Sequence, residues 1–373
     1  MESAHLDEQR VNMVTRRFLC SRFSLVPCLF GGCLFLILFQ NYDLTDRMFR
    51  DEQGSAASLI SLSPRSNSSS IQARHCALLF FGVPRLFRNV VLPSIQKYIL
   101  EANPDCDVFV HTCNITTLSV LRNNEQNGTL IPTDVYGLNP NAAMIENMES
   151  FYAQRNLSYF RKHHYLGWGP CCGSTDNMVK QWHSIDGAWK LMEQYAQQEN
   201  LGDGENYYSR VGLFRSDVFY THPIYVVSNS TSEQRQKEEE AVVPRFLWKK
   251  FGPSPYLVND RMFYGTYQNA KVWATGRFDY VPKFVAAIEN RTDLQGIHSE
   301  TFMRWLIGNM ASLQKKDICF WLVRTTGLID TSDCENNESK LNTEQNKEMI
   351  SKGMDCCWDC IDGYYNCTEK QEH

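Results

Sequence analysis

Apolar residues after position 74 form short continuous runs that alternate with stretches of helical spacing. Residues 76–81 are an uninterrupted apolar run that ends at Gly82, which predicts a strand buried on both faces. Residues 88–100 place apolar side chains at helical spacing, and residues 107–111 form the next strand-like run. A strand, a helix of about three turns and a second strand predict a βαβ unit with parallel strands.

The same alternation continues along the chain. Residues 207–219 form an apolar strand segment interrupted by a polar triplet at 215–217. No repeat of about 20–50 residues is visible, which disfavours solenoids and propellers. We expect an α/β fold with a mostly parallel, Rossmann-like sheet flanked by helices. The remaining predicted elements are helices at 178–197, 266–275 and 299–306 and a strand at 241–248.

One long apolar segment lies near the N-terminus. Residues 23–42, from Phe23 to Tyr42, carry no charge, and at 1.5 Å per residue they span a hydrocarbon layer of ~30 Å. Arginines precede the segment, so residues 1–22 are expected in the cytosol and the rest in a lumen. A cleaved signal peptide is the alternative, but no small-residue cleavage site follows. We expect a type II signal anchor that contacts lipid of the Golgi or endoplasmic reticulum membrane.

Composition divides the luminal part into three regions. Residues 43–74 are Ser-rich and predict a flexible stem, residues 75–330 a globular domain, and residues 331–373 a polar insertion followed by a Cys-rich tail. The cysteines of that tail lack the two separated CxxC pairs of a structural zinc site, so we favour disulfides over zinc. They are Cys356, Cys357, Cys360 and Cys367.

Sequons and cysteines also indicate an oxidising lumen. Eleven of the 14 cysteines lie beyond the apolar segment, and this odd number leaves at least one unpaired within a monomer. Eight Asn-x-Ser/Thr sequons lie beyond it too, although some of them could be buried or unused. They begin at Asn67, Asn114, Asn127, Asn156, Asn229, Asn290, Asn337 and Asn366.

Charge and missing motifs exclude several classes of protein. The formal net charge of -5 disfavours a nucleic-acid partner, because a phosphate backbone needs a basic surface. The sequence contains no GxxxxGK[ST], GxGxxG, GxSxG or HExxH. P-loop enzymes, kinases, serine hydrolases and zincins therefore lose support.

Two polar groups follow predicted strands at the sheet edge where α/β proteins bind ligands. Gly82 and Arg85 come after the first strand, and Arg can hold a phosphate bidentately; the alternative is a turn with a solvated Arg. Arg215 and Asp217 belong to the polar triplet at 215–217, which ends an apolar strand segment. Asp217 is a candidate ligand for Mg²⁺ or Mn²⁺, or a ribose contact; the alternative is an internal ion pair. The DxD at 105–107 precedes a strand and lies at the wrong edge.

Two further positions combine charge with helix starts. Asp260 and Arg261 stand beside aromatic residues that lead into a predicted helix, a mixture suited to sugar recognition, although Asp260 could simply cap that helix. Glu300 lies in the first turn of the next helix. There it could act as a general base for an acceptor hydroxyl, or only favour the helix dipole.

Motifs in order along residues 75–310 resemble those of nucleotide-diphospho-sugar (GT-A) glycosyltransferases. The matching segments are ALLFFGVPR, NPDCDVFVHT, the helix with Gln181 and Trp182, GLFRSDV, NDRMFYG and HSETF. They are similar to the family's G-x-x-R turn, its R-x-D at the end of a central strand, its D-R-F-x-x-G and its later S/P-E. The triplet at 215–217 supplies one acid where a full DxD supplies two.

The resemblance implies a role for each candidate residue. A nucleotide-sugar donor would lie near Gly82 and Arg85, and Asp217 would stand where a metal- or ribose-binding acid sits. Asp260 and Arg261 would contact the donor sugar or phosphate, and Glu300 would be the base.

The leading hypothesis is a glycosyltransferase of the secretory pathway. It would move a sugar from a nucleotide-diphospho-sugar to a hydroxyl of a glycan or glycoprotein. A non-catalytic luminal glycan-binding or scaffolding protein is the alternative. A glycoside hydrolase is a third hypothesis, which needs two carboxyl groups facing each other across one cleft.

Overall fold

The computed structural model describes most of the chain beyond residue 74. The predicted cytosolic tail, signal anchor and stem lie outside the described residues, as do the sequons at Asn67, Asn229, Asn290 and Asn337. Within the described part, no helix is both long enough and apolar enough to cross a membrane. The described residues are 75–120, 125–168, 172–227, 240–246, 257–289, 296–308, 310, 312–330, 354–361 and 364–369.

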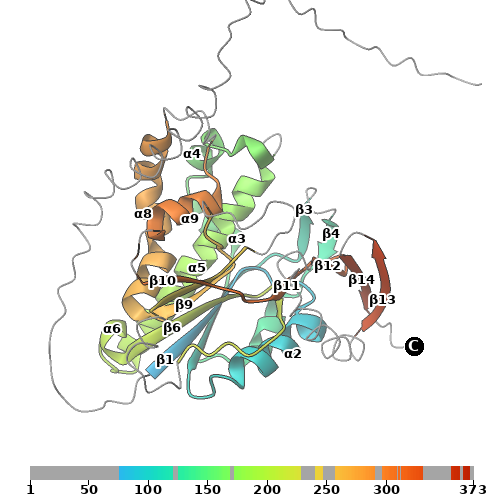
Figure 1. The fold of residues 1–373 in the computed structure, drawn as a ribbon, viewed down its shortest axis with the longest axis horizontal. Coiled ribbons are helices and arrows are strands. Elements are labelled where there is room, and N and C mark those ends of the chain that lie inside the picture. Colours follow the sequence, from blue (N-terminus) through green and yellow to red (C-terminus); the bar gives the residue numbers. More distant parts are fainter. Residues whose placement is uncertain are drawn as a thin grey trace, which may run out of the picture. The chain divides into compact units, whose positions relative to one another are not determined.

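A seven-stranded sheet forms the centre of the domain (Figure 1), in the order β10-β8-β9-β6-β1-β2-β5. β1 pairs in parallel with β2 and β6, β2 with β5, and β8 with β10, whereas β9 runs antiparallel to β6 and β8. The predicted mostly parallel α/β sheet is therefore confirmed. The strands are β1 (His75–Phe81), β2 (Asp107–Cys113), β5 (Ala142–Glu146), β6 (Tyr208–Arg215), β8 (Ala241–Pro244), β9 (Met262–Thr266) and β10 (Leu313–Lys316).

Helices cover both faces of this sheet, as the apolar run of β1 predicts. Leu78 and Phe80 pack into the core beneath α2 (Leu92–Ile95). α2 is the middle part of one continuous helical stretch, between η2 (Phe87–Val91) and η3 (Gln96–Leu100). On the other face lie α5 (Gly173–Gln198) and α8 (Tyr267–Ile288). There the Phe81 ring lies 6.1 Å from the ring of Trp273 on α8. The remaining helices are η5 (Pro132–Leu138), α3 (Met148–Gln154), α4 (Leu157–Lys162), η6 (Leu166–Trp168), α6 (Gly204–Tyr207) and α9 (Ser299–Ile307).

A second, antiparallel sheet has the order β13-β14-β12-β11-β7. The predicted strand at 207–219 is divided between the two sheets, because the chain turns at Ser216 and Asp217 after β6 and then enters β7. The strands are β7 (Val218–Tyr220), β11 (Phe320–Val323), β12 (Leu328–Asp330), β13 (Met354–Ile361) and β14 (Tyr364–Glu369). A separate hairpin joins β3 (Thr117–Val120) to β4 (Glu125–Thr129).

The segment after Asp260 differs from the prediction. We expected residues 259–265 to lead into a helix at 266–275. Helix α8 does begin at Tyr267, with Thr266 as its N-cap, but Met262 begins a strand, β9, that was not predicted. All but the last residue of β9 are buried, as befits an interior strand. A side chain at Gly265 would collide with the backbone of Glu240, so glycine permits the close approach of the neighbouring chain.

The described residues contain a disulfide and exposed sequons. Cys76 and Cys106 form a disulfide, and Cys113 is a buried free thiol. The sequon residues Asn114, Asn127 and Asn156 are all at least partly exposed.

Candidate active site

A cavity lies beyond the carboxyl ends of β1, β2 and β6, at the sheet edge where the sequence predicted ligand binding. Its volume is about 90 Å³, well below the ~300–1,000 Å³ of pockets that enclose a whole drug-sized ligand. The cavity therefore suits one part of a larger ligand. Its lining includes Gly82, Arg85, Cys113, Asn177, Lys180, Gln181, Ser184, Arg215 and Asp217.

The turn after β1 forms one wall of the cavity. Gly82 adopts a φ of 91°, a left-handed conformation that glycine tolerates, and an added Cβ would meet no atom within 4 Å. Its amide donates to Ser184 Oγ on α5 at 2.8 Å. The turn thus tied to α5 brings Arg85 to the cavity, where only 7% of that residue is exposed.

Asp217 is enclosed by two arginines. Its Oδ1 accepts from Arg215 Nε at 2.7 Å, and its Oδ2 accepts from Arg215 Nη2 at 2.7 Å and from Arg85 Nη1. Burial would raise the pKa of Asp217, but the charges of Arg215 and Arg85 outweigh it and hold that pKa well below its usual range. Asp217 is therefore an ionised member of a buried ion-pair cluster.

A second carboxylate, Glu125 at the start of β4, supports Arg85 from behind. Glu125 is fully buried, and its Oε1 accepts from Arg85 Nε at 3.0 Å. The same oxygen accepts from the backbone N–H of Thr325 at 2.9 Å and from its hydroxyl at 3.1 Å. Arg85 therefore bridges two buried carboxylates.

Asp260, Arg261 and Glu300 form a group beside the cavity. Arg261 Nη1 lies 3.4 Å from both Asp260 Oδ1 and Glu300 Oε1. Gln181 on α5 lines the cavity and also donates to the Asp260 carbonyl at 3.4 Å. The charges of Arg261 and Asp260 reach Arg215 as well. Candidates up to 218 positions apart, from Gly82 to Glu300, thus lie around one edge of the sheet.

Ser299 explains how Asp260 is held. The sequence left open that Asp260 caps the helix that follows it, but the N-cap of α8 is Thr266. The Ser299 hydroxyl instead donates to Asp260 Oδ2 at 2.5 Å. Trp182 Nε1 donates to Ser299 Oγ at 3.3 Å and ties the pair to α5.

The predicted divalent metal does not fit Asp217. Both carboxylate oxygens already accept hydrogen bonds from arginines, and among the described residues that line the cavity no second acid faces them. A Mg²⁺ or Mn²⁺ ion there would bring its positive charge close to two guanidinium groups.

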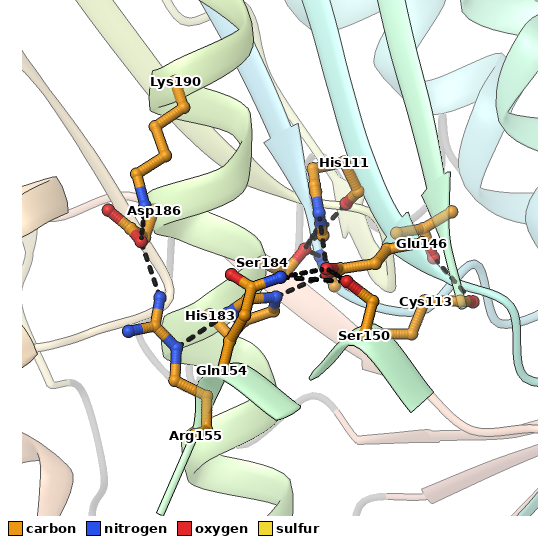
Figure 2. A network of polar contacts seen from close by, with 12 residues as sticks. His111, Cys113, Glu146, Ser150, Gln154, Arg155, His183, Ser184, Asp186 and Lys190 are labelled. Atoms are coloured by element: carbon orange, nitrogen blue, oxygen red, sulfur yellow. Dashed lines mark hydrogen bonds and ion pairs between the residues drawn. The ribbon is translucent and has the colours of Figure 1, made fainter. Parts of the chain in front are cut away.

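Figure 2 shows a network of polar contacts that contains potential metal ligands and includes Cys113 and Ser184 from the cavity lining. Candidate ligand atoms of His111, Glu146 and His183 lie within 4.8 Å of one another, and all three residues are buried. Glu146 Oε2 is approached by Nε2 of both histidines. His183 Nε2 forms a hydrogen bond with this oxygen, and His111 Nε2 lies 3.3 Å from it. These hydrogen bonds, led by the one from His111, outweigh burial and lower the pKa of Glu146 to about 2.

Proton positions in this network oppose metal binding. Arg155 Nε donates to His183 Nδ1 at 2.8 Å, so the ring proton of His183 lies on Nε2 and is donated to Glu146. The Ser184 hydroxyl donates to the His111 carbonyl at 2.7 Å, and its oxygen lies 3.2 Å from His111 Nδ1. A metal would need the nitrogen of His183 that already bears a proton. The network is therefore better described as a hydrogen-bonded relay from Arg155 to Ser184.

Cys113 stands between this relay and the cavity. Burial chiefly, and the Glu146 carboxylate in addition, raise the pKa of the thiol to about 11, so the thiol remains protonated near neutral pH. Cys113 therefore contributes a neutral wall.

Several of these residues escaped the sequence analysis. Glu125, Glu146 and His183 carry no motif, and only the fold brings them to the sheet edge. One signal was present in the amphipathic helix α5, where four polar residues fall at helical spacing on one face. These residues are Asn177, Lys180, Gln181 and Ser184.

The chain has distant structural likenesses to known proteins. No protein-family model matches the chain, and no curated protein matches it in sequence. It is similar to mouse xyloside xylosyltransferase 1 in its apo form, with 9% identity over 65% of this chain and 85% of that chain and a TM-score of 0.35. It is also similar to a Desulfovibrio desulfuricans G20 protein described as a nucleotide-diphospho-sugar transferase, with 12% identity over 75% of this chain and 98% of that chain and a TM-score of 0.21. With TM-scores this low, neither likeness assigns a function to the chain.

Proposed function

We propose that the protein is a glycosyltransferase that binds a nucleotide-diphospho-sugar at the carboxyl edge of its central sheet. The observation that carries the proposal is the grouping of Arg85, Arg215 and Asp217 around one cavity, with Arg261 and Glu300 beside it. A cavity at this edge that is lined by cationic side chains suits an anionic ligand.

The proposed reaction uses the two parts of the site differently. The bond between the anomeric carbon and the diphosphate breaks, and the diphosphate leaves with the electron pair. The acceptor oxygen bonds to that carbon, and its proton passes to Glu300, whose Oε1 faces Arg261. Arg85 and Arg215 would stabilise the charge that develops on the leaving diphosphate. The acceptor is a hydroxyl of a glycan or glycoprotein.

Calorimetric titration of the full-length chain with UDP, GDP and their sugars tests the proposal. We expect one nucleotide to bind and the Asp217→Asn variant to bind at least ~10-fold more weakly, because an amide no longer fixes the two arginines. Asp317→Asn is the matched control, since Asp317 forms only an exposed ion pair with Arg245.

Two further results complete this test. Glu300→Gln should lower transfer while leaving nucleotide affinity within ~3-fold, because Glu300 acts on the acceptor. If no nucleotide binds to the intact protein, a glycan-binding or scaffolding role replaces the proposed enzyme.

A hydrolase is less well supported by the carboxylates. Asp217 is bonded to arginines through both oxygens, and Asp260 accepts from Ser299. Neither is poised as a free acid or base facing Glu300.

The proposal places the enzyme in the secretory pathway, anchored by residues 23–42. Exposure of Asn114, Asn127 and Asn156 is compatible with a luminal domain. Glycosidase treatment after expression in cells should lower the apparent mass, and protease protection of sealed vesicles should preserve the C-terminal domain. Digestion of that domain in intact vesicles would contradict this topology.

A further inference from the structure

We infer that the cavity grips the diphosphate of its ligand with Arg85, Lys180 and Arg215 and needs no divalent metal ion. This inference rests on the proposed function and specifies how the ligand's charge is met.

The charge around the cavity has the sign that an anionic ligand requires. Three cationic side chains, Arg85, Lys180 and Arg215, line the cavity together with one carboxylate, Asp217, and Glu125 behind Arg85 supplies a second, which leaves a surplus of one positive charge. A nucleotide sugar carries one ionised oxygen on each of its two phosphates, so this surplus attracts its diphosphate.

The arginines keep donors for a ligand after their internal bonds are made. Arg85 uses Nε for Glu125 and one Nη1 proton for Asp217, and Arg215 uses Nε and one Nη2 proton for Asp217. A guanidinium has five N–H donors, so three remain on each arginine. The internal bonds thus fix the orientation of both guanidinium planes and leave the remaining donors for phosphate oxygens.

Lys180 adds a charge with no ion pair among the described residues. It is half-buried on α5, between Asn177 and Ser184 on the face of the helix that lines the cavity. A lone ammonium with three donors beside two fixed guanidinium groups is costly without an anion, because like charges repel. A bound diphosphate would offset that repulsion.

The groups that could hold a metal are already committed. Both oxygens of Asp217 accept from arginines, and the relay proton on His183 Nε2 occupies the nitrogen that a metal would need. Mg²⁺ and Mn²⁺ also prefer oxygen ligands, whereas the relay offers two imidazoles and one carboxylate.

Titration of the full-length protein with UDP and GDP, in EDTA and again in Mn²⁺, tests this inference. We expect the nucleotide that binds to do so with dissociation constants within ~3-fold of each other under the two conditions. Lys180→Met should weaken binding at least ~10-fold in EDTA, as expected for loss of a charge-assisted hydrogen bond. Lys180→Arg should retain most of the affinity, and Lys162→Met, a change at an exposed lysine of α4, should leave it unchanged.

The outcomes separate this inference from the proposed function. Binding that requires Mn²⁺, or that is unaffected by Lys180→Met in a variant with an unchanged urea midpoint, would overturn the metal-free grip and leave the nucleotide site standing. Absence of nucleotide binding under both conditions would overturn the proposed function and the grip together.

Discussion

Replacing Arg85 with Met should destabilise the domain more than any single surface ion pair could. Arg85 is 7% exposed and bridges Asp217, which is 2% exposed, and Glu125, which is fully buried. Asp217 keeps Arg215, but Glu125 keeps only its two bonds from Thr325. Removing one partner of a buried ion pair costs about 3–5 kcal/mol, because a buried charge is left uncompensated. We expect a loss of that size in the free energy of unfolding.

Urea unfolding followed by tryptophan fluorescence measures this loss, provided that the slope of the transition is unchanged. The matched control is Arg161→Met, because Arg161 forms an ion pair with Asp176 at the surface and should contribute only about 0–1 kcal/mol. Adding Glu125→Gln to the Arg85→Met variant should restore part of the stability, since an amide does not leave a buried charge. A loss below ~1 kcal/mol for Arg85→Met, or strictly additive effects of the two changes, would refute the bridging role.

Three other predictions concern the relay and the covalent frame. The folded-state pKa of Glu146 is lowered from 4.5 to about 2, so its ionised form stabilises the domain fully above pH ~4.5. The difference in the free energy of unfolding between the natural chain and the Glu146→Gln variant, measured by urea titration, should therefore shrink as the pH falls towards 2. Gly187→Ala should cost about 1–3 kcal/mol, since the new Cβ would strike the ring of His111, whereas Gly173→Ala meets no atom and should cost far less in the same assay. The Cys76–Cys106 disulfide joins residues 30 positions apart. Replacing both cysteines with alanine should lower the free energy of unfolding, measured by calorimetry, by about 3.5 kcal/mol. An unchanged unfolding transition would contradict the loop-entropy effect expected of this cross-link.

The parallel half of the fold could be predicted because its strands are buried on both faces. The run at 76–81 has side chains packed against α2 on one face and against α8 on the other, so apolar continuity identified it. β9 was not predicted as a strand, because its three buried apolar residues are too few to show the period of a strand. The second sheet also escaped prediction, since β7, β11 and β12 are three or four residues long and pair with segments far away in the chain.

The candidate site followed a similar rule. Arg85 and Asp217 come directly after strands, so the general position of ligands in α/β sheets singled them out. Glu125 could not be found this way, because it reaches Arg85 through a hairpin outside the central sheet. His183 lies on a long amphipathic helix among many other polar residues, and its role depends on Arg155 and Glu146 from other elements. Convergence of this kind requires three-dimensional information.

Among the described residues, the chain beyond Lys316 contributes no side chain to the lining of the cavity, yet it supplies part of the surrounding wall. Val323 donates its amide to the Asp217 carbonyl at 3.0 Å, and Thr325 holds the carboxylate that steadies Arg85. β14 in turn hydrogen-bonds to β12, the neighbour of β11. A proteolytic cut or premature stop after Lys316 would keep all the lining residues but remove the segments that support Asp217 and Glu125. Anyone trimming the polypeptide for expression should therefore keep its far end.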